Sequence, residues 1–198
     1  MMYPKLRELK EAVRALIKGP YTTKFPYQPH TPFPRFRGKP KFHEEDCVGC
    51  GACFNVCPAK AIDMQDMAGK RYLMVRYDRC IFCGQCQANC LTGKGIVLSQ
   101  EFDLATTGRR EELRQKISKD LVVCRDCGEV IGPYDQIEFV AKKLGALAFS
   151  NTTLLLFYLQ HQDLALKDSA RQDDTDFSRS DRIKVICARC RREAVIKS

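Results

Sequence analysis

The sequence has no tryptophan, only three histidines and no long apolar run. Its most apolar stretch, residues 144–159, is broken by four polar residues, whereas a transmembrane helix needs roughly 18 or more apolar residues in succession. The histidines at positions 30, 43 and 161 belong to no Ser/His/Asp constellation. A phosphate-binding loop and a dinucleotide fingerprint are also missing. We therefore expect no catalytic residue on this chain.

The N-terminal segment, residues 1–20, lacks the pattern of a secretory signal. Its charges recur every few residues, with no apolar central region and no leading twin arginine. We therefore expect the protein to be made and kept in the cytosol. A length of 198 residues allows one domain or two small ones, and a hydrophobic fraction of 44% argues against wholesale disorder. In that compartment, the twelve cysteines favour metal ligation over disulfides.

The first eight cysteines repeat the pattern C-x2-C-x2-C-x3-C twice, with a period of 33 residues. Three close thiolates on a tight loop can wrap one face of a cubane iron–sulfur cluster. The fourth lies where the chain leads away, and so it ligates the other cluster. This doubled spacing therefore predicts two [4Fe–4S] clusters. The first is held by Cys47, Cys50, Cys53 and Cys90, and the second by Cys80, Cys83, Cys86 and Cys57.

The two cysteine runs end differently. Cys57 is followed by Pro58, as the two-cluster pattern expects, whereas Cys90 is followed by Leu-Thr-Gly. We expect the ligand to be kept, with Gly93 partly replacing the missing turn signal.

The segment between the runs reads as strand, turn and strand, over residues 61–65 and 71–77. The cysteine region is therefore predicted to be a small α+β, ferredoxin-like domain. Its core is largely the two clusters, so its folding should depend on their insertion.

The last four cysteines form two CxxC pairs, which predict one tetrahedral four-thiolate site. The pairs are Cys124 with Cys127 and Cys187 with Cys190. Structural zinc is the expected metal, while a single rubredoxin-type iron, no metal, or a redox CxxC remain alternatives. Helical patterns span residues 133–145 and 152–167, and a short charged helix is expected at 111–119. The polar segment 169–181 is expected to be a mobile loop.

The N-terminal segments carry apolar and aromatic side chains without the pattern of a core. Residues 3–18 predict an amphipathic helix of roughly 24 Å, suited to an anionic membrane surface or a partner subunit, or else packed on its own domain. Residues 19–45 combine six prolines and six aromatic residues. This composition favours an extended strap whose aromatic side chains lie in grooves of a neighbour or of its own domain. The strap is also basic, but no RNA-binding signature accompanies it, so we expect no nucleic-acid partner.

Together these patterns predict an α+β protein in four parts. They are an amphipathic docking helix at 1–18, the strap at 19–45, a 2[4Fe–4S] ferredoxin domain at 46–105, and a small metal-knuckle domain at 106–198. The net charge of +9 assumes neutral thiols. Bound clusters and a zinc tetrathiolate would offset much of it, so we interpret the excess of Lys and Arg as partial compensation and docking surface.

The order of these parts resembles a known family. The helix, the Gly19-Pro20-Tyr21 turn, the strap ending at Pro40, the eight-cysteine core and the segment 96–105 are similar to the two-cluster ferredoxin subunit of respiratory complex I and of related membrane-bound [NiFe] hydrogenases. The added CxxC pairs look closest to the iron–sulfur subunit of formate hydrogenlyase and similar energy-converting hydrogenases. The resemblance covers residues 1 to about 105 well, and the remainder mainly through the cysteine pairs.

The resemblance implies a non-catalytic subunit that relays single electrons between a ferredoxin-like input subunit and the small cluster-bearing subunit beside the large subunit. It implies a peripheral position on the cytoplasmic side of the inner membrane. The corresponding subunit of NADH-quinone oxidoreductase (complex I) and a free-standing soluble ferredoxin are the alternatives. A free carrier would be shorter and acidic, and would not need the helix, strap and knuckle.

Overall fold

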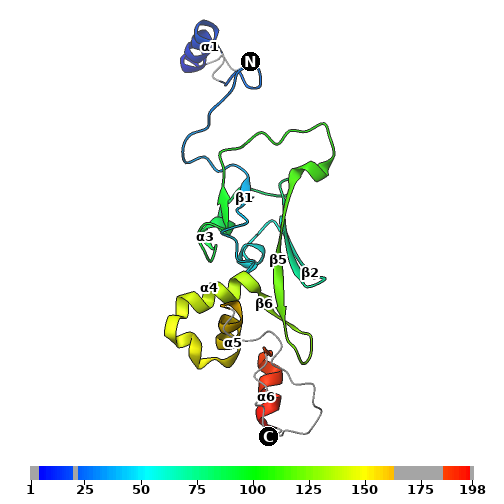
Figure 1. Cartoon of the computed structure of the whole chain (residues 1–198). Coiled ribbons are helices and arrows are strands. Elements are labelled where there is room, and N and C mark those ends of the chain that lie inside the picture. The colour runs from blue at the N-terminus through cyan, green and yellow to red at the C-terminus, as the bar shows by residue number, and fades with distance from the viewer. Residues whose placement is uncertain (1–4, 20–21, 163–184, 197–198) are drawn as a thin grey trace. The chain divides into compact units, whose positions relative to one another are not determined.

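The computed structural model describes residues 5–19, 22–162 and 185–196 (Figure 1). The chain divides into two units, Met1–Phe36 and Arg37–Ser198. The unit boundary falls inside the segment we expected to be the strap. Within the described residues, no helix is both long and apolar enough to cross a bilayer. The observed architecture mixes helices and antiparallel sheets, in agreement with the α+β prediction.

The first unit contains α1 (Leu6–Lys18), which confirms the predicted N-terminal helix. The Glu8 carboxylate accepts a hydrogen bond from the backbone N–H of Lys5, and the helix ends at Gly19 with φ +80°. No residue of α1 is buried, and Leu6 and Leu16 are each 86% exposed. The described part of the following segment also exposes aromatic rings, with Tyr27 94% and Phe33 82% exposed.

The second unit is built on two antiparallel sheets. The smaller pairs β1 (Pro40–Phe42) with β4 (Ile96–Leu98). The larger has the order β2 (Ile62–Met67), β3 (Lys70–Arg76), β5 (Arg114–Val123) and β6 (Val130–Pro133). Two single-turn helices, α2 (Ala52–Asn55) and α3 (Gln85–Ala88), lie within the two cysteine runs.

Strands β2 and β3 form the hairpin that the sequence predicts between the cysteine runs. Their connection, Ala68 and Gly69, has φ +51° and +74°. Two successive positive φ angles match the twist of a tight hairpin, and this choice of turn fixes the register. That register pairs Asp66 with Arg71 and Met64 with Leu73.

The prediction of a charged helix at residues 111–119 is wrong. A short 3-10 turn, η1 (Arg110–Leu113), leads directly into strand β5. Residues 114–120 pair with the whole of β3, which satisfies backbone groups that would otherwise form an open sheet edge. Inward side chains alternate at Gln115, Ile117 and Lys119, a period of two that the local charge obscures. Strand β5 also carries the sheet across the boundary that we predicted between residues 105 and 106.

One face of the large sheet is arranged in three cross-strand rows. Ile62, Val75 and Gln115 form the first row, and Met64, Leu73 and Ile117 form the second. Leu73 and Val75 are almost fully buried, and each such side chain contributes about 1.5–3 kcal/mol by leaving water. The third row is charged and consists of Asp66, Arg71 and Lys119.

The Gln115 side chain on β5 joins the small sheet to the large one, because its amide forms hydrogen bonds with the Phe42 backbone as a neighbouring strand would. The Gln115 amide donates to the Phe42 carbonyl oxygen (3.1 Å) and accepts from the Phe42 N–H (2.8 Å). Pro40 lies at the first residue of the short strand β1, where the missing N–H is tolerated.

The helix predicted at 133–145 is confirmed as α4 (Tyr134–Leu144). The helix predicted at 152–167 begins as expected but ends earlier, as α5 (Thr152–His161), and residues 163–167 lie outside the described residues. A 3-10 segment, η2 (Gly145–Ser150), connects them, and the Asn151 side chain caps α5 by accepting from the N–H groups of Thr153 and Leu154. The last helix is α6 (Ala188–Ile196). The loop expected at 169–181 lies outside the described residues.

Candidate iron–sulfur and metal sites

One cavity brings together the first predicted cluster set. Its apolar wall includes Phe42, Leu73 and Ile96. All four cysteines of the set lie around it: Cys47, Cys50, Cys53 and Cys90. The fourth cysteine of the second run therefore lies with the first three of the first run, as the crossed arrangement requires.

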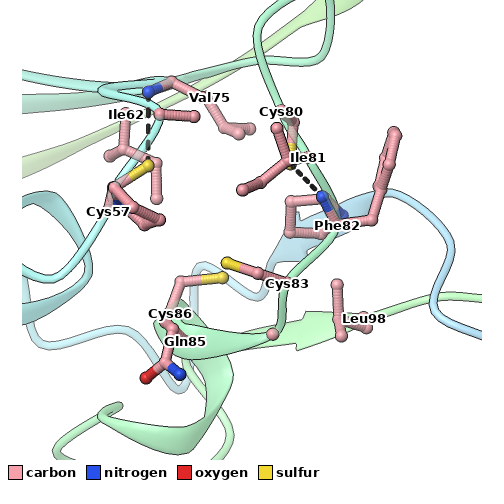
Figure 2. Close-up of a pocket in the computed structure, with 15 residues that line it drawn as sticks. Cys57, Ile62, Val75, Cys80, Ile81, Phe82, Cys83, Gln85, Cys86 and Leu98 are labelled. Atoms are coloured by element: carbon pink, nitrogen blue, oxygen red, sulfur yellow. Dashed lines mark hydrogen bonds between the residues drawn. The ribbon is translucent and has the colours of Figure 1, made fainter.

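A second cavity gathers the other set, and Figure 2 shows its four cysteines around one space. Ile62, Val75 and Leu98 contribute apolar side chains to its wall. The cysteines are Cys57, Cys80, Cys83 and Cys86. The structure thus brings the eight cysteines into the two predicted groups, and ligation by them stays a prediction.

The chemistry of both cavities fits an iron–sulfur cluster. Burial, with the neighbouring sulfurs Cys47 and Cys50, raises the pKa of Cys53 to about 12. Burial likewise raises the pKa of Cys86 to about 11. These thiols hold their protons at neutral pH unless a cation replaces them, and coordination to iron is such a replacement. Four converging soft sulfur ligands in an apolar wall suit [4Fe–4S].

Backbone N–H groups point at several of these sulfurs. The Ala61 N–H donates to Cys57 Sγ (3.2 Å) and the Phe82 N–H to Cys80 Sγ (3.4 Å), both drawn in Figure 2. Burial acts to raise the pKa of Cys90, but hydrogen bonds from Thr92 and from nearby backbone N–H groups lower it overall. Such N–H···S contacts stabilise a thiolate and tune a bound cluster.

In the turn after Cys90, Thr92 and Gly93 form the contacts that shape the chain where the pattern expects a proline. Gly93 adopts φ +73°, and its N–H donates to the Cys90 carbonyl oxygen (3.0 Å). Thr92 Oγ1 accepts a hydrogen bond from the Gly95 N–H (3.0 Å). The prediction for Gly93 is confirmed, whereas the contribution of Thr92 was not foreseen.

Two cations contact the first cysteine run or the residues just before it, and neither was predicted from the sequence. Arg71 Nη1 donates to the Gly49 carbonyl oxygen (3.2 Å), and Lys119 Nζ donates to the Glu44 carbonyl oxygen (2.5 Å). Their side chains are only 13% and 11% exposed. The available signal was the two-residue alternation on β3 and β5, which places both cations on the inner face of the sheet.

The last four cysteines meet in one cluster, with their sulfurs all within 4.8 Å of one another. Cys124 follows strand β5, and Cys187 directly precedes α6. Cys127 Sγ and Cys187 Sγ are 3.7 Å apart. A tetrahedron with metal–sulfur bonds near 2.3 Å has edges of about 3.8 Å. The described residues therefore offer a closed four-thiol site of the right size.

The electrostatics of this site favour a thiolate. Burial acts to raise the pKa of Cys124, but hydrogen bonds from the N–H groups of Cys127 and Cys187 outweigh it, and the pKa falls to about 6. The Cys187 N–H lies 3.2 Å from Cys124 Sγ. Gly128, with φ +72°, makes the tight turn behind the first pair, and its N–H donates to the Cys124 carbonyl oxygen.

Comparisons with known proteins give one family and several relatives. The 4Fe-4S dicluster domain family matches residues 33–94, which supports bound 4Fe–4S clusters. Formate hydrogenlyase subunit 6 of Escherichia coli is 35% identical over 129 residues, covering 64% of this chain and 71% of the relative. NADH-quinone oxidoreductase subunit I of Syntrophotalea carbinolica is also 35% identical over 129 residues, covering 59% of this chain and 70% of the relative.

Two further likenesses are partial. NAD(P)H-quinone oxidoreductase subunit I of Gloeobacter violaceus is 30% identical over 101 residues, and the chain spans about half of its length (48% of each). A chain from the membrane-bound sulfane sulfur reductase, an archaeal respiratory membrane complex, is 34% identical over 57% of this chain and 62% of its own, with a TM-score of 0.41. That score is too low to establish a shared overall fold. At 35% identity, the chain covers more than two thirds of the length of both formate hydrogenlyase subunit 6 and the Syntrophotalea carbinolica subunit I. The chain therefore belongs to the family of two-[4Fe–4S] ferredoxin-like subunits that includes formate hydrogenlyase subunit 6 and NADH-quinone oxidoreductase subunit I.

Proposed function

We propose that this chain is an electron-transfer subunit that relays single electrons through two [4Fe–4S] clusters within a membrane-associated [NiFe] hydrogenase complex of the formate hydrogenlyase type. The observation that carries the proposal is the pair of cavities, each lined by one crossed set of four cysteines. When bound, such clusters supply one-electron redox chemistry with little change in geometry. The chain's own residues hold them, shield them from water and set their electrostatic surroundings.

The ligand roles follow from the same cavities. We assign Cys47, Cys50, Cys53 and Cys90 to the first cluster, and Cys57, Cys80, Cys83 and Cys86 to the second. The apolar walls exclude water and lower the local dielectric constant, which strengthens every N–H···S contact. No substrate chemistry is required of these residues, so we propose a non-catalytic subunit.

The four C-terminal cysteines are proposed to hold one structural zinc ion. All four donors are thiols, so the coordination shell is closed and leaves no position for a substrate. A single rubredoxin-type iron would suit the same donors, and metal analysis distinguishes the two metals. The proposed role is to fix the junction between β5 and α6.

The partners are proposed to be the other subunits of such a complex. These are a ferredoxin-like input subunit and the small and large hydrogenase subunits, with the chain held peripherally on the cytoplasmic side of the membrane. Helix α1 and the strap are the proposed docking elements, since their apolar and aromatic side chains are exposed in the first unit. Proteins rarely leave such a set uncovered unless something binds it.

The second candidate is the equivalent subunit of NADH-quinone oxidoreductase, which the 35% identity to subunit I of Syntrophotalea carbinolica favours. Affinity purification of the tagged full chain from its native membranes separates the candidates. We expect nickel in the purified complex, and about eight irons and one zinc in this chain when it is purified on its own. Recovery as a lone soluble monomer would overturn the proposal, and a nickel-free complex that oxidises NADH would support the second candidate.

A further inference from the structure

The charged row on the inner face of the large sheet is unusual in its chemistry. Arg71 and Lys119 are direct partners across the β3–β5 pair, and like charges opposite each other destabilise a sheet. Both side chains are nearly buried, which adds a desolvation cost. Both costs are reduced by nearby negative charge, of which Asp66 and Asp135 are one source.

Each cation is held between a carboxylate and the first cysteine loop. The Arg71 guanidinium binds both oxygens of Asp66 at 2.8 Å and also donates to the Gly49 carbonyl oxygen. Lys119 Nζ lies 2.7 Å from an Asp135 oxygen and also donates to the Glu44 carbonyl oxygen. Both ion pairs are thus dipoles: the positive end of one contacts the loop of the first run at Gly49, and that of the other contacts Glu44, three residues before Cys47.

Both cations lie against the loop between two of the assigned ligands. Gly49 stands between Cys47 and Cys50; its carbonyl oxygen accepts a hydrogen bond from Arg71, and a Cβ atom at this position would lie 3.1 Å from Lys119 Cγ. Positive charge at this position makes the first cavity more favourable to negative charge.

The second run is preceded by one part-buried ion pair, Arg76 with Asp78 (3.3 Å), but Arg76 lies on the face of β3 opposite to Val75, which lines the second cavity. The loop of the second run receives a hydrogen bond from Arg37 Nη1 to the Cys83 carbonyl oxygen (3.3 Å), but the Arg37 side chain is exposed and therefore screened by water. The described residues that line the two cavities include no charged side chain. The difference between the runs therefore lies in the buried cation row.

We propose that Arg71 and Lys119 raise the reduction potential of the cluster held by the first run above that of the cluster held by the second. The inference rests on the proposed function, because it needs both clusters. Reduction adds one negative charge to a cluster, and a fixed cation nearby stabilises the reduced form more than the oxidised form. The first site is thereby the resting position of an electron shared between the two.

The test is a redox titration of the full chain, followed by electron paramagnetic resonance, in which the two clusters titrate separately. Lys119→Met and Arg71→Gln should each shift the reduction equilibrium of the higher-potential signal about tenfold toward the oxidised form, which is about 59 mV for a one-electron couple. The lower-potential signal should hardly move. Lys116→Met is the matched control, because Lys116 lies on the outer side of β5, over the Tyr72 ring.

Two further variants separate electrostatics from a merely structural role. Asp135→Asn removes the anionic end of one dipole, so it should shift the same signal toward the reduced form by a few fold. Lys119→Arg keeps the charge and should restore the original potential. A loosened loop would move all variants in one direction, and this result would overturn the inference.

The outcomes also distinguish the two proposals. A preparation of the unmodified chain that holds fewer than two clusters by iron content would overturn the proposed function. Two clusters with potentials that respond to Lys119→Met no more than to Lys116→Met would overturn only the present inference. Movement of the lower-potential signal instead would overturn it as well.

Discussion

The two cysteine runs share one spacing but not one environment. Gly51 and Gly84, 33 residues apart, have φ +74° and +82° and begin the short helices α2 and α3. Where the first run has Gly49 at φ +69°, however, the second has Phe82 at φ +54°. The backbone shape is therefore common to both runs, while the residue that adopts it is not.

Packing explains why only one of the two positions is glycine. A Cβ atom at Gly49 would lie 3.1 Å from Lys119 Cγ and 3.2 Å from Pro133 Cβ, because β5 and β6 pack on the first loop. A left-handed conformation costs a larger residue about 1–3 kcal/mol, which Phe82 carries in the second loop. The motif thus requires the left-handed turn, and glycine is favoured where another element lies against it.

The largest expected effect is the loss of one cluster on cysteine substitution. It tests whether each cavity takes three ligands from one run and the fourth from the other. Cys57→Ser should remove the same cluster as Cys83→Ser, and Cys90→Ser the same cluster as Cys50→Ser, because each pair lines one cavity. Iron content should fall from about eight to about four atoms per chain in each variant. Electron paramagnetic resonance identifies which signal is lost. If Cys57→Ser reproduced the spectrum of Cys50→Ser instead, the crossed assignment would be wrong.

A second, smaller effect concerns the C-terminal metal site. Cys124 of that site directly follows β5, the strand whose Lys119 binds Asp135 of α4 and the backbone of Glu44 just before the first run. Cys187→Ser should abolish zinc binding, since three thiols no longer close the site. Hydrogen exchange should then accelerate in α4 and α5, with both clusters retained. The loop of the first run should also exchange faster than the loop of the second. Loss of iron together with zinc would contradict this separation, and equal exchange in the two loops would contradict the connection.

The sequence was informative wherever chemistry requires a fixed spacing. The cysteine runs, the hairpin between them and the two CxxC pairs could all be predicted, because ligand geometry and local turns leave few alternatives. Strand β5 could not, since its formation depends on pairing with β3, and charged residues such as Lys116 and Lys119 hide its period of two. Arg71 and Lys119 were missed for the same reason: their positions depend on strand register.

A third test compares substitutions at Gly49 in the first run and at Phe82, its counterpart in the second. Gly49→Ala adds both the strain of a positive φ and the close contacts with Lys119 and Pro133, so it should destabilise the protein by about 2 kcal/mol. Phe82→Gly relieves similar strain but loses packing and makes the unfolded chain freer, so its net effect should stay within about 1 kcal/mol. Rates of cluster bleaching in guanidinium compare the two. Equal acceleration would show that the packing on Gly49 is unimportant.

The smallest effect concerns acid, and it follows from the ion pair on the side of the first run. Hydrogen bonds from Arg71 lower the pKa of Asp66, against a smaller opposing effect of burial. The folded-state pKa is thus below the unfolded value of about 3.9. The pair therefore stabilises the fold fully above that value, and its contribution is lost as the pH falls through the folded-state pKa. Because Asp66 is partly exposed, the contribution is about 0.5 kcal/mol.

Asp66→Asn removes this contribution and isolates its pH dependence. At neutral pH the variant should lose its clusters about twofold faster than the unmodified chain in guanidinium, and the ratio should approach one as the pH falls through the folded-state pKa of Asp66. Asp120→Asn is the matched control, because Asp120 pairs with Lys70 at 3.4 Å on the same sheet but both side chains are at least half exposed. Its ratio should stay near one throughout. A ratio of cluster-loss rates that grew for Asp66→Asn as the pH fell would contradict the lowered pKa of Asp66. It would also contradict the ion pair between Asp66 and Arg71.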